Sequence, residues 1–204
     1  MSDVTTVSEA RLAPPYRERR SGLLGLYDAT VSAAVGLLDG WFTGLVARFA
    51  IFSVLGMYYL SSAWKGLDGS LANLFSPTDS TFITMFPQAF EAAGYDTSAL
   101  AFFPYTPVAV LGTIGELVLP ILVLVGLFTR IAAVGLAIVV AVQSYVDVTG
   151  HGLDEKSIGA PFDRLPDAVI WDQRLLWIAL LAILAVRGPG LLSIDAILRR
   201  SSRD

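Results

Sequence analysis

An acidic residue in the most apolar stretch of the chain is the first candidate for chemistry. Glu116 is the only charged residue between Thr97 and Thr129. A carboxylate near the centre of a bilayer costs several kcal/mol unless it is protonated or paired, so Glu116 either carries protons or holds helices together. Pro120 has no N–H to bond the Glu116 carbonyl, and we therefore expect a kink beside the acid. Both roles stay open, and Glu116 is the candidate proton carrier.

Further polar side chains fall at the same predicted depth as Glu116. Gln143, Asp147 and His151 are spaced by four residues, which places them on one face of a helix. At about 1.5 Å per residue, Gln143 and Glu116 both lie roughly 10–15 Å below the outer surface. This pattern favours a polar cavity that opens outward, although single members can also extend to the surface or belong to an aromatic belt. The candidate cavity residues are Tyr58, Glu116, Gln143, Asp147, Arg174 and Trp177.

The residues that the chain lacks exclude several classes of chemistry. There is no cysteine, which removes disulfides, thiol catalysis, cysteine-bound iron–sulfur clusters and covalently attached haem. The single histidine, His151, stands between two glycines, and this setting is typical of a solvated loop residue. No metal-binding cluster, phosphate-binding loop or nucleophile–base pair is found in the sequence, and a net charge of −4 argues against nucleic acid as a partner. Any reaction here would use a diffusible cofactor or a partner's chemistry.

The elements that position these residues can be predicted from composition. Hydrophobic residues make up 54% of the chain and charged residues 16%, against about 25% charged in soluble domains. Crossing a membrane takes about 20 apolar residues, and four stretches suffice: 42–64, 105–128, 131–149 and 169–187. Residues 23–38 have the periodicity of a helix in the membrane interface; the alternative of a signal peptide is disfavoured by Asp28. The predicted fold is all-α, a four-transmembrane-helix bundle with an N-terminal interfacial helix, over residues 23–198.

The positions of the basic residues predict the orientation of the bundle. Nine fall on one side of a four-span arrangement: Arg11, Arg17, Arg19, Arg20, Arg130, Arg187, Arg199, Arg200 and Arg203. Four fall towards the other side: Lys65, Lys156, Arg164 and Arg174. Because positive residues concentrate on the cytoplasmic side, we expect both termini there, with polar tails over 1–22 and 199–204.

The connections between the spans differ in kind. A tight turn at Thr129-Arg130 makes the second and third spans antiparallel neighbours. The long segment 66–104 is rich in aromatic residues, and Phe82, Phe86 and Phe90 are spaced by four. This spacing favours short helices at the outer membrane surface. After the fourth span, Gly188-Pro189-Gly190 ends the helix, and Ser193 is placed to cap a short helix after it.

Several of these runs resemble the DoxX family of small membrane proteins. The most specific is GELVLPILVLVGLFTRIAAVGLAIVVAVQ (115–143). The run LLWIALLAILAVRGPGLLSIDAIL (175–198) is similar to the fourth span of that family and its closing GPG-x-LS-x-D motif, and LYDATVSAAV with ARFAIFSVLGMYYLSSAWKG resembles its N-terminal part. The chain departs from the pattern at Leu60, where relatives often carry a basic residue or histidine, and in its longer 66–104 segment.

The resemblance implies a four-helix integral protein of a bacterial or archaeal cytoplasmic membrane. Some members of the family are subunits of quinone-linked oxidoreductases, including thiosulfate:quinone oxidoreductase, and others are membrane accessories of redox or metal-stress systems. By position, Glu116 and Arg130 match the recurrent acid and the turn arginine of the family. The absence of cofactor ligands in the sequence favours an accessory role over a free-standing enzyme, and we expect no covalently bound cofactor.

Three functions remain open from the sequence. In the first, the chain is a membrane subunit of a redox system and binds a quinone among the candidate residues named above. In the second, it is a non-catalytic anchor or assembly factor that docks a partner protein of a redox system through 66–104. In the third, it is a small proton-coupled transporter, which is disfavoured because no internal repeat or paired broken helices are present.

Overall fold

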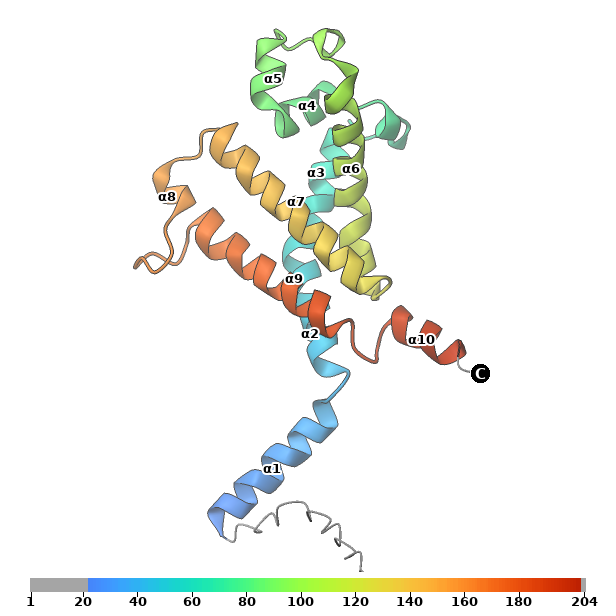
Figure 1. The fold of residues 1–204 in the computed structure, drawn as a ribbon, viewed down its shortest axis with the longest axis vertical. Helices are drawn as coiled ribbons and strands as arrows, with labels where there is room; N and C mark the ends of the chain where they lie inside the picture. Colours follow the sequence, from blue (N-terminus) through green and yellow to red (C-terminus); the bar gives the residue numbers. More distant parts are fainter. Residues whose placement is uncertain (1–21, 203–204) are drawn as a thin grey trace, which may run out of the picture. The chain divides into compact units, whose positions relative to one another are not determined.

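The computed structural model describes residues 22–202, and over that range it consists of helices and loops without a strand (Figure 1). Most of the predicted tail 1–22 and the last two residues lie outside the described range. The predicted all-α class is confirmed. Four helices are long and apolar enough to cross a membrane: Phe42–Gly66, Phe102–Val125, Thr129–Thr149 and Val169–Arg187.

These four helices begin and end within three residues of the predicted spans, but two of them are not regular. The first consists of α2 (Phe42–Ile51), a π-helical turn (Phe52–Gly56) and α3 (Met57–Gly66), and the fourth of a π-helical turn (Val169–Arg174) followed by α9 (Leu175–Arg187). Such turns are rare and arise often at functional sites. The second and third spans are α6 (Phe102–Val125) and α7 (Thr129–Thr149).

The turn between α6 and α7 comes earlier than predicted. Gly126 takes the left-handed conformation (φ 73°) and its N–H, like that of Leu127, bonds the Leu122 carbonyl. A left-handed glycine of this kind ends a helix because it carries no Cβ to clash. Phe128 is also left-handed, so Thr129 is already the first residue of α7. The turn therefore occupies 126–128, and Thr129-Arg130 belongs to the next helix.

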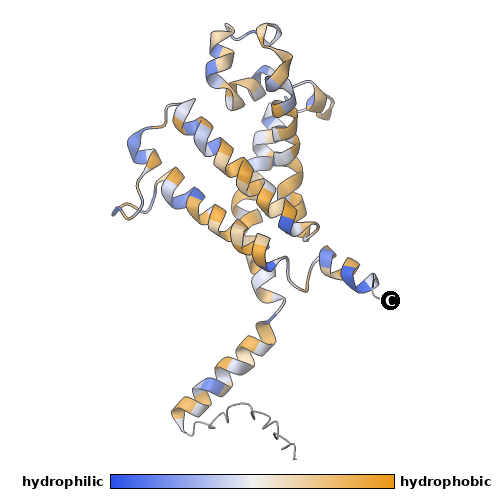
Figure 2. Ribbon diagram, viewed as in Figure 1, coloured by the Kyte–Doolittle hydropathy of each residue, from blue (hydrophilic) through white to orange (hydrophobic). Residues whose placement is uncertain are grey.

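Figure 2 shows that the four spans consist mainly of hydrophobic residues. They close into a bundle around an apolar core. Neighbour contacts run from α3 to α6, from α6 to α7, from α7 to α9 and from α9 back to α2. The buried core residues are Ala47, Ile51, Leu55, Tyr59, Val123, Ala132, Ala133, Leu136, Val140, Leu181 and Leu184. Small residues such as Ala132 and Ala133 let helix backbones approach closely, which is how helices associate in membranes.

A second, smaller core lies under the segment 66–104. It holds α4 (Asp79–Met85) and α5 (Pro87–Ala92) against α6, together with two short 3₁₀ turns (Leu71–Phe75 and Thr97–Ala99). The predicted short helices are present, but their phenylalanines face α6: Phe82 and Phe90 are each 1% exposed, with ring centroids 6.0 Å apart. Phe86 lies between the two helices because the residue before a proline is disfavoured in a helix.

The remaining helices are α1 (Leu23–Leu38), α8 (Glu155–Ile158) and α10 (Ile194–Ser201). The chain divides into two compact units, Met1–Asp39 and Gly40–Asp204, and α1 is in the first. None of the side chains of α1 is buried, and its placement in the membrane interface stays a prediction. Helix α10 extends into the predicted C-terminal tail.

Candidate functional site

Helix α3 carries two adjacent tyrosines, one on its buried face and one on its exposed face. Tyr59 is fully buried, whereas Tyr58 is 43% exposed. Gln143 of α7 connects them: the Tyr59 hydroxyl donates to Gln143 Oε1 (3.1 Å), and Gln143 Nε2 donates to the Tyr58 hydroxyl. Because the amide accepts on one side and donates on the other, it orients both tyrosines.

Trp177 of α9 completes this group of aromatic and amide side chains. Its ring centroid lies 6.5 Å from that of Tyr58, and the Tyr58 and Tyr59 rings meet edge to face at 5.2 Å. Three different helices thus contribute an exposed hydroxyl, a half-buried amide and an indole. We call Tyr58, Gln143 and Trp177, with Tyr59 behind them, the aromatic–amide site.

An ion pair lies one helical turn away from Gln143. Arg174, the last residue of the π-helical turn, is 4% exposed and forms a salt bridge with Asp147 of α7. Its Nη1 also donates to the Ser144 hydroxyl at 3.1 Å, while its Nε is buried without a partner among the described residues. The pair fastens α7 to the start of α9, so Arg174 is held inside the bundle and does not extend to the surface.

Glu116 lies apart from this group, in a small cavity of its own. It is 8% exposed, and the Ser62 hydroxyl of α3 donates a hydrogen bond to its carboxyl. The cavity measures about 10 Å³, enough for about one water molecule. Its wall is formed by Ser62, Ala63, Gly66, Thr81, Thr84, Met85, Thr113 and Glu116. None of the other predicted site residues lines it.

One residue lies between the two groups. Tyr59 is within electrostatic range of Glu116 as well as of Asp147 and Arg174. The residues expected to line a single outward cavity therefore fall into two groups, with Tyr59 between them. The expected kink at Pro120 is not seen as a break in the backbone angles, since Phe103 is the residue of α6 with non-helical angles.

Tyr59, Ser144 and Ser62 were not among the predicted site residues. Tyr59 is spaced by four from both Leu55 and Ala63, and all three are buried. A tyrosine in a buried stripe of this spacing needs a partner for its hydroxyl. This requirement could have identified Tyr59 from the sequence. His151, in contrast, is exposed as expected, with its Nε2 3.1 Å from the Thr84 carbonyl oxygen.

The closing motif of the chain fastens the opposite end of the bundle. Arg48 is 3% exposed and donates to the carbonyls of Leu124 (2.7 Å), Gly44 (3.3 Å) and Leu192. It therefore joins the first span, the end of the second and the motif, as a structural arginine.

Asp195 of the same motif caps α7. Its carboxylate accepts from the N–H groups of Phe128 (2.8 Å) and Thr129 (3.0 Å) and from the Thr129 hydroxyl (3.0 Å). Partial burial raises the pKa of Asp195, but these hydrogen bonds outweigh it and hold the pKa below its usual value. The acid is thus ionised at neutral pH and stabilises the positive end of the helix dipole.

No group of three His, Asp or Glu side chains that could hold a metal ion is present within residues 22–202. Among known families, residues 67–149 match the DoxX family, which confirms the resemblance over α4–α7 and includes Glu116, Gln143 and Asp147. The chain matches no curated protein and no solved structure. It is an integral membrane, DoxX-like protein.

Proposed function

We propose that this protein is a quinone-interacting accessory subunit of a membrane redox system, with the quinone head group at the aromatic–amide site. The observation that carries the proposal is the pairing of the exposed Tyr58 hydroxyl with the Gln143 amide beside Trp177. Within residues 22–202 we find no group that could itself hold a redox metal. Electrons would therefore come from a partner, which makes the role an accessory one.

The side chains of the site fit the chemistry of a quinone. A bound quinone supplies two-electron, two-proton redox chemistry, and its carbonyl oxygens accept hydrogen bonds. Gln143 Nε2 already donates to the Tyr58 oxygen, so the Tyr58 hydroxyl proton is available to an outside acceptor. Trp177 provides an aromatic wall, and the exposed Val54 and Met57 provide an apolar surface for an isoprenoid tail.

The buried groups behind the site suit the handling of protons. Tyr59 donates to Gln143 and fixes the direction in which the amide points. Glu116, whose cavity has room for about one water, is the proposed proton carrier on the far side of Tyr59. The Thr81 and Thr84 side chains line the same cavity and would lead protons towards α4.

A pair of matched tyrosine variants tests the proposal. Tyr58→Phe removes one hydroxyl at the site, and the loss of a hydrogen bond of about 1 kcal/mol predicts about fivefold weaker quinone binding. Tyr145→Phe is the control, because Tyr145 is 69% exposed on α7 and its hydroxyl makes no hydrogen bond within the described range. Binding is measured by quenching of tryptophan fluorescence in detergent. Equal affinity of the two variants would contradict the assignment.

A second function is favoured by exposed aromatic side chains on the segment 66–104 and the start of α6. Phe75, Phe102 and Phe103 are 75%, 72% and 77% exposed, and such residues are common at the centre of protein interfaces. In this alternative the chain is a non-catalytic anchor or assembly factor that docks a partner there. Substituting all three by serine would release a co-purifying partner while leaving quinone affinity unchanged.

A further inference from the structure

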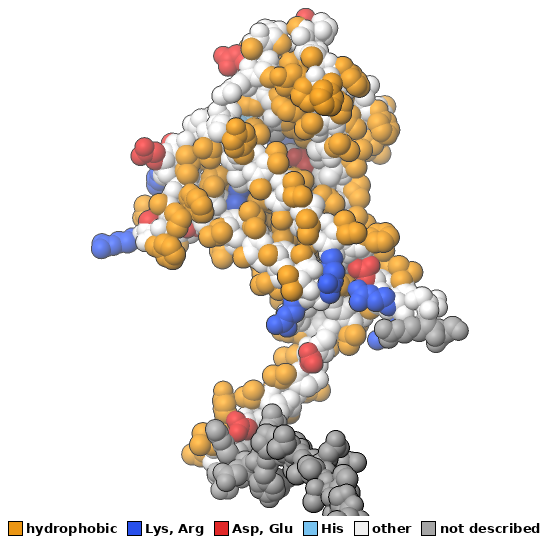
Figure 3. Space-filling view, viewed as in Figure 1, with side chains coloured by type: hydrophobic (Ala, Val, Ile, Leu, Met, Phe, Trp, Pro, Cys, Tyr) orange, Lys and Arg blue, Asp and Glu red, His pale blue; other side chains and the backbone are white. Residues whose placement is uncertain are grey.

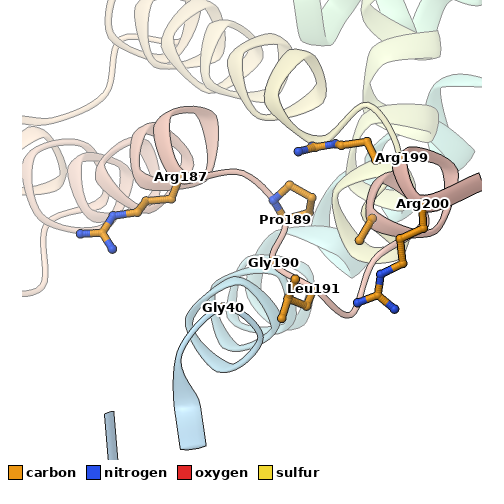
Figure 4. Close-up of a pocket in the computed structure, with 8 residues that line it drawn as sticks. Gly40, Arg187, Pro189, Gly190, Leu191, Arg199 and Arg200 are labelled. Atoms are coloured by element: carbon orange, nitrogen blue, oxygen red, sulfur yellow. The ribbon is translucent and has the colours of Figure 1, made fainter. Parts of the chain in front are cut away.

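A pocket at the Gly126 end of the bundle is lined by arginines that the functions above do not use. It measures about 300 Å³ and lies between the end of α9, the Gly188–Ser193 loop and α10. Figure 4 shows Arg187 at the end of α9 and Arg199 and Arg200 on α10, around Pro189 and Leu191. We call this the arginine pocket.

The charge of the pocket is largely uncompensated. The structure gives one salt bridge over residues 22–202, between Arg174 and Asp147, so the pocket arginines form none there. Asp195 lies within electrostatic range of Arg199, but its carboxylate accepts the hydrogen bonds that cap α7. Arginine side chains gather at this end of the second unit with few acids among them (Figure 3). The pocket therefore suits an anion.

The surface beside the pocket identifies what kind of anion. Leu191, which lines the pocket, and Leu192 next to it are 52% and 56% exposed. Ile194, Ile197 and Leu198, which are 37%, 65% and 53% exposed, share the opposite face of α10 from the pocket-lining Ala196, Arg199 and Arg200. A short helix with an apolar face and terminal arginines is typical of one that lies in a membrane interface. A lipid in the pocket would cover the exposed leucines with its acyl chains, whereas a free anion would leave them in water.

We propose that the arginine pocket binds the head group of a net-anionic phospholipid, with its acyl chains against the exposed Leu191 and Leu192. The loop that forms the pocket floor packs closely against the start of the first span, which favours a defined site over non-specific attraction. A Cβ on Gly44 would lie 2.3 Å from the Pro189 carbonyl oxygen, and one on Gly190 would lie 2.9 Å from the Gly40 carbonyl oxygen. Basic pockets at the cytoplasmic ends of spans recognise such head groups, and the predicted orientation places this end there.

Lipid binding to the purified full-length protein tests the proposal. The test variant is Arg187→Gln/Arg200→Gln, which leaves Arg199 beside Asp195. The control is Lys156→Gln/Arg164→Gln, which also removes two exposed charges but lies outside the pocket. Native mass spectrometry in neutral detergent measures affinity for phosphatidylglycerol and for phosphatidylcholine. Each pocket arginine contributes about fivefold, since a basic residue near an anionic surface is worth about 1 kcal/mol.

The wild type and the control should prefer phosphatidylglycerol, and the test variant should lose affinity for it by about 25-fold with unchanged melting temperature before lipid is added. Arg187→Lys/Arg200→Lys should keep most of the preference and serves if the glutamine variant does not fold. Equal affinity for the two lipids, or a preference that the test variant retains, would overturn the proposal. So would displacement of phosphatidylglycerol by millimolar inorganic phosphate, which would identify a site for a free anion.

Discussion

Removing either member of the Arg174–Asp147 pair should destabilise the bundle strongly, and removing both should not. The Arg174 side chain is 5% exposed and that of Asp147 20% exposed, so each charge depends on the other for compensation. Breaking a buried pair by deleting one partner costs about 3–5 kcal/mol, because the remaining charge is buried alone. Replacing both partners by apolar residues of similar volume is often neutral or stabilising.

The exposures predict an asymmetry between the two single variants. Asp147→Leu leaves the guanidinium of Arg174 almost fully buried with Nε already unpartnered, so its cost belongs at the upper end, about 5 kcal/mol. Arg174→Met leaves a carboxylate that reaches solvent, and its cost belongs at the lower end, about 3 kcal/mol. The free energy of unfolding of Asp147→Leu/Arg174→Met should lie within about 1–2 kcal/mol of that of the wild type.

A double-mutant cycle in mixed micelles measures these free energies. Unfolding is followed by circular dichroism as the fraction of denaturing detergent rises, with Arg164→Met as a surface control that should stay within about 0.5 kcal/mol of the wild type. A coupling energy below about 0.5 kcal/mol would mean that the two residues act independently. That result would refute the argument that this pair fastens α7 to α9.

Three more predictions concern single residues. Glu116→Gln should fold normally and abolish function in a complementation assay, because an amide cannot exchange a proton at accessible pH; full activity at normal abundance would leave Glu116 a structural role. Gly44→Ala should lower stability by about 1–3 kcal/mol, since its Cβ would lie 2.3 Å from a carbonyl oxygen, whereas the control Gly115→Ala meets its neighbours at 3.6 Å and should be tolerated; equal melting temperatures would contradict the packing. Asp195→Asn should cost about 1 kcal/mol at neutral pH as a weakened cap. Because the folded pKa of Asp195 lies below its usual 3.8, its stabilisation is present above that pH and is lost as pH falls through the folded pKa, so the difference in melting temperature between the variant and the wild type should shrink as pH is lowered below 3.8; a difference that does not change with pH would contradict the cap.

The spans could be predicted from the sequence because long apolar runs are a local property. The turn between α6 and α7 shifted by a few residues because it depends on Asp195, nearly seventy residues further on, which caps α7 from another helix. Local propensity does not report such a contact. The role of Arg48 could not be predicted from the sequence, because its partners are backbone carbonyls, which every sequence offers and no motif identifies.

The depth of the candidate site residues in the membrane could be predicted from the sequence, but the direction in which their side chains point could not. Counting residues placed Gln143 and Glu116 at the same level, yet the fold turns Gln143 to Tyr59 and Glu116 to Ser62. The π-helical turns explain part of the difference, because an extra residue in a turn rotates the rest of the helix about its axis. Arg174 ends such a turn and points inward to Asp147, whereas a regular helix gave no reason to choose between the interior and the surface.

The most direct test of the proposed function is photolabelling with a quinone that carries an azido group on its ring. The purified protein is irradiated with the probe, with and without an excess of unmodified quinone, and the labelled peptides are identified by mass spectrometry. We predict labelling within Met57–Gly66 and Leu175–Arg187, the helices α3 and α9 that hold Tyr58 and Trp177, and loss of the label with excess quinone. Labelling that excess quinone does not displace, or that falls on α10 and α1 alone, would contradict the account.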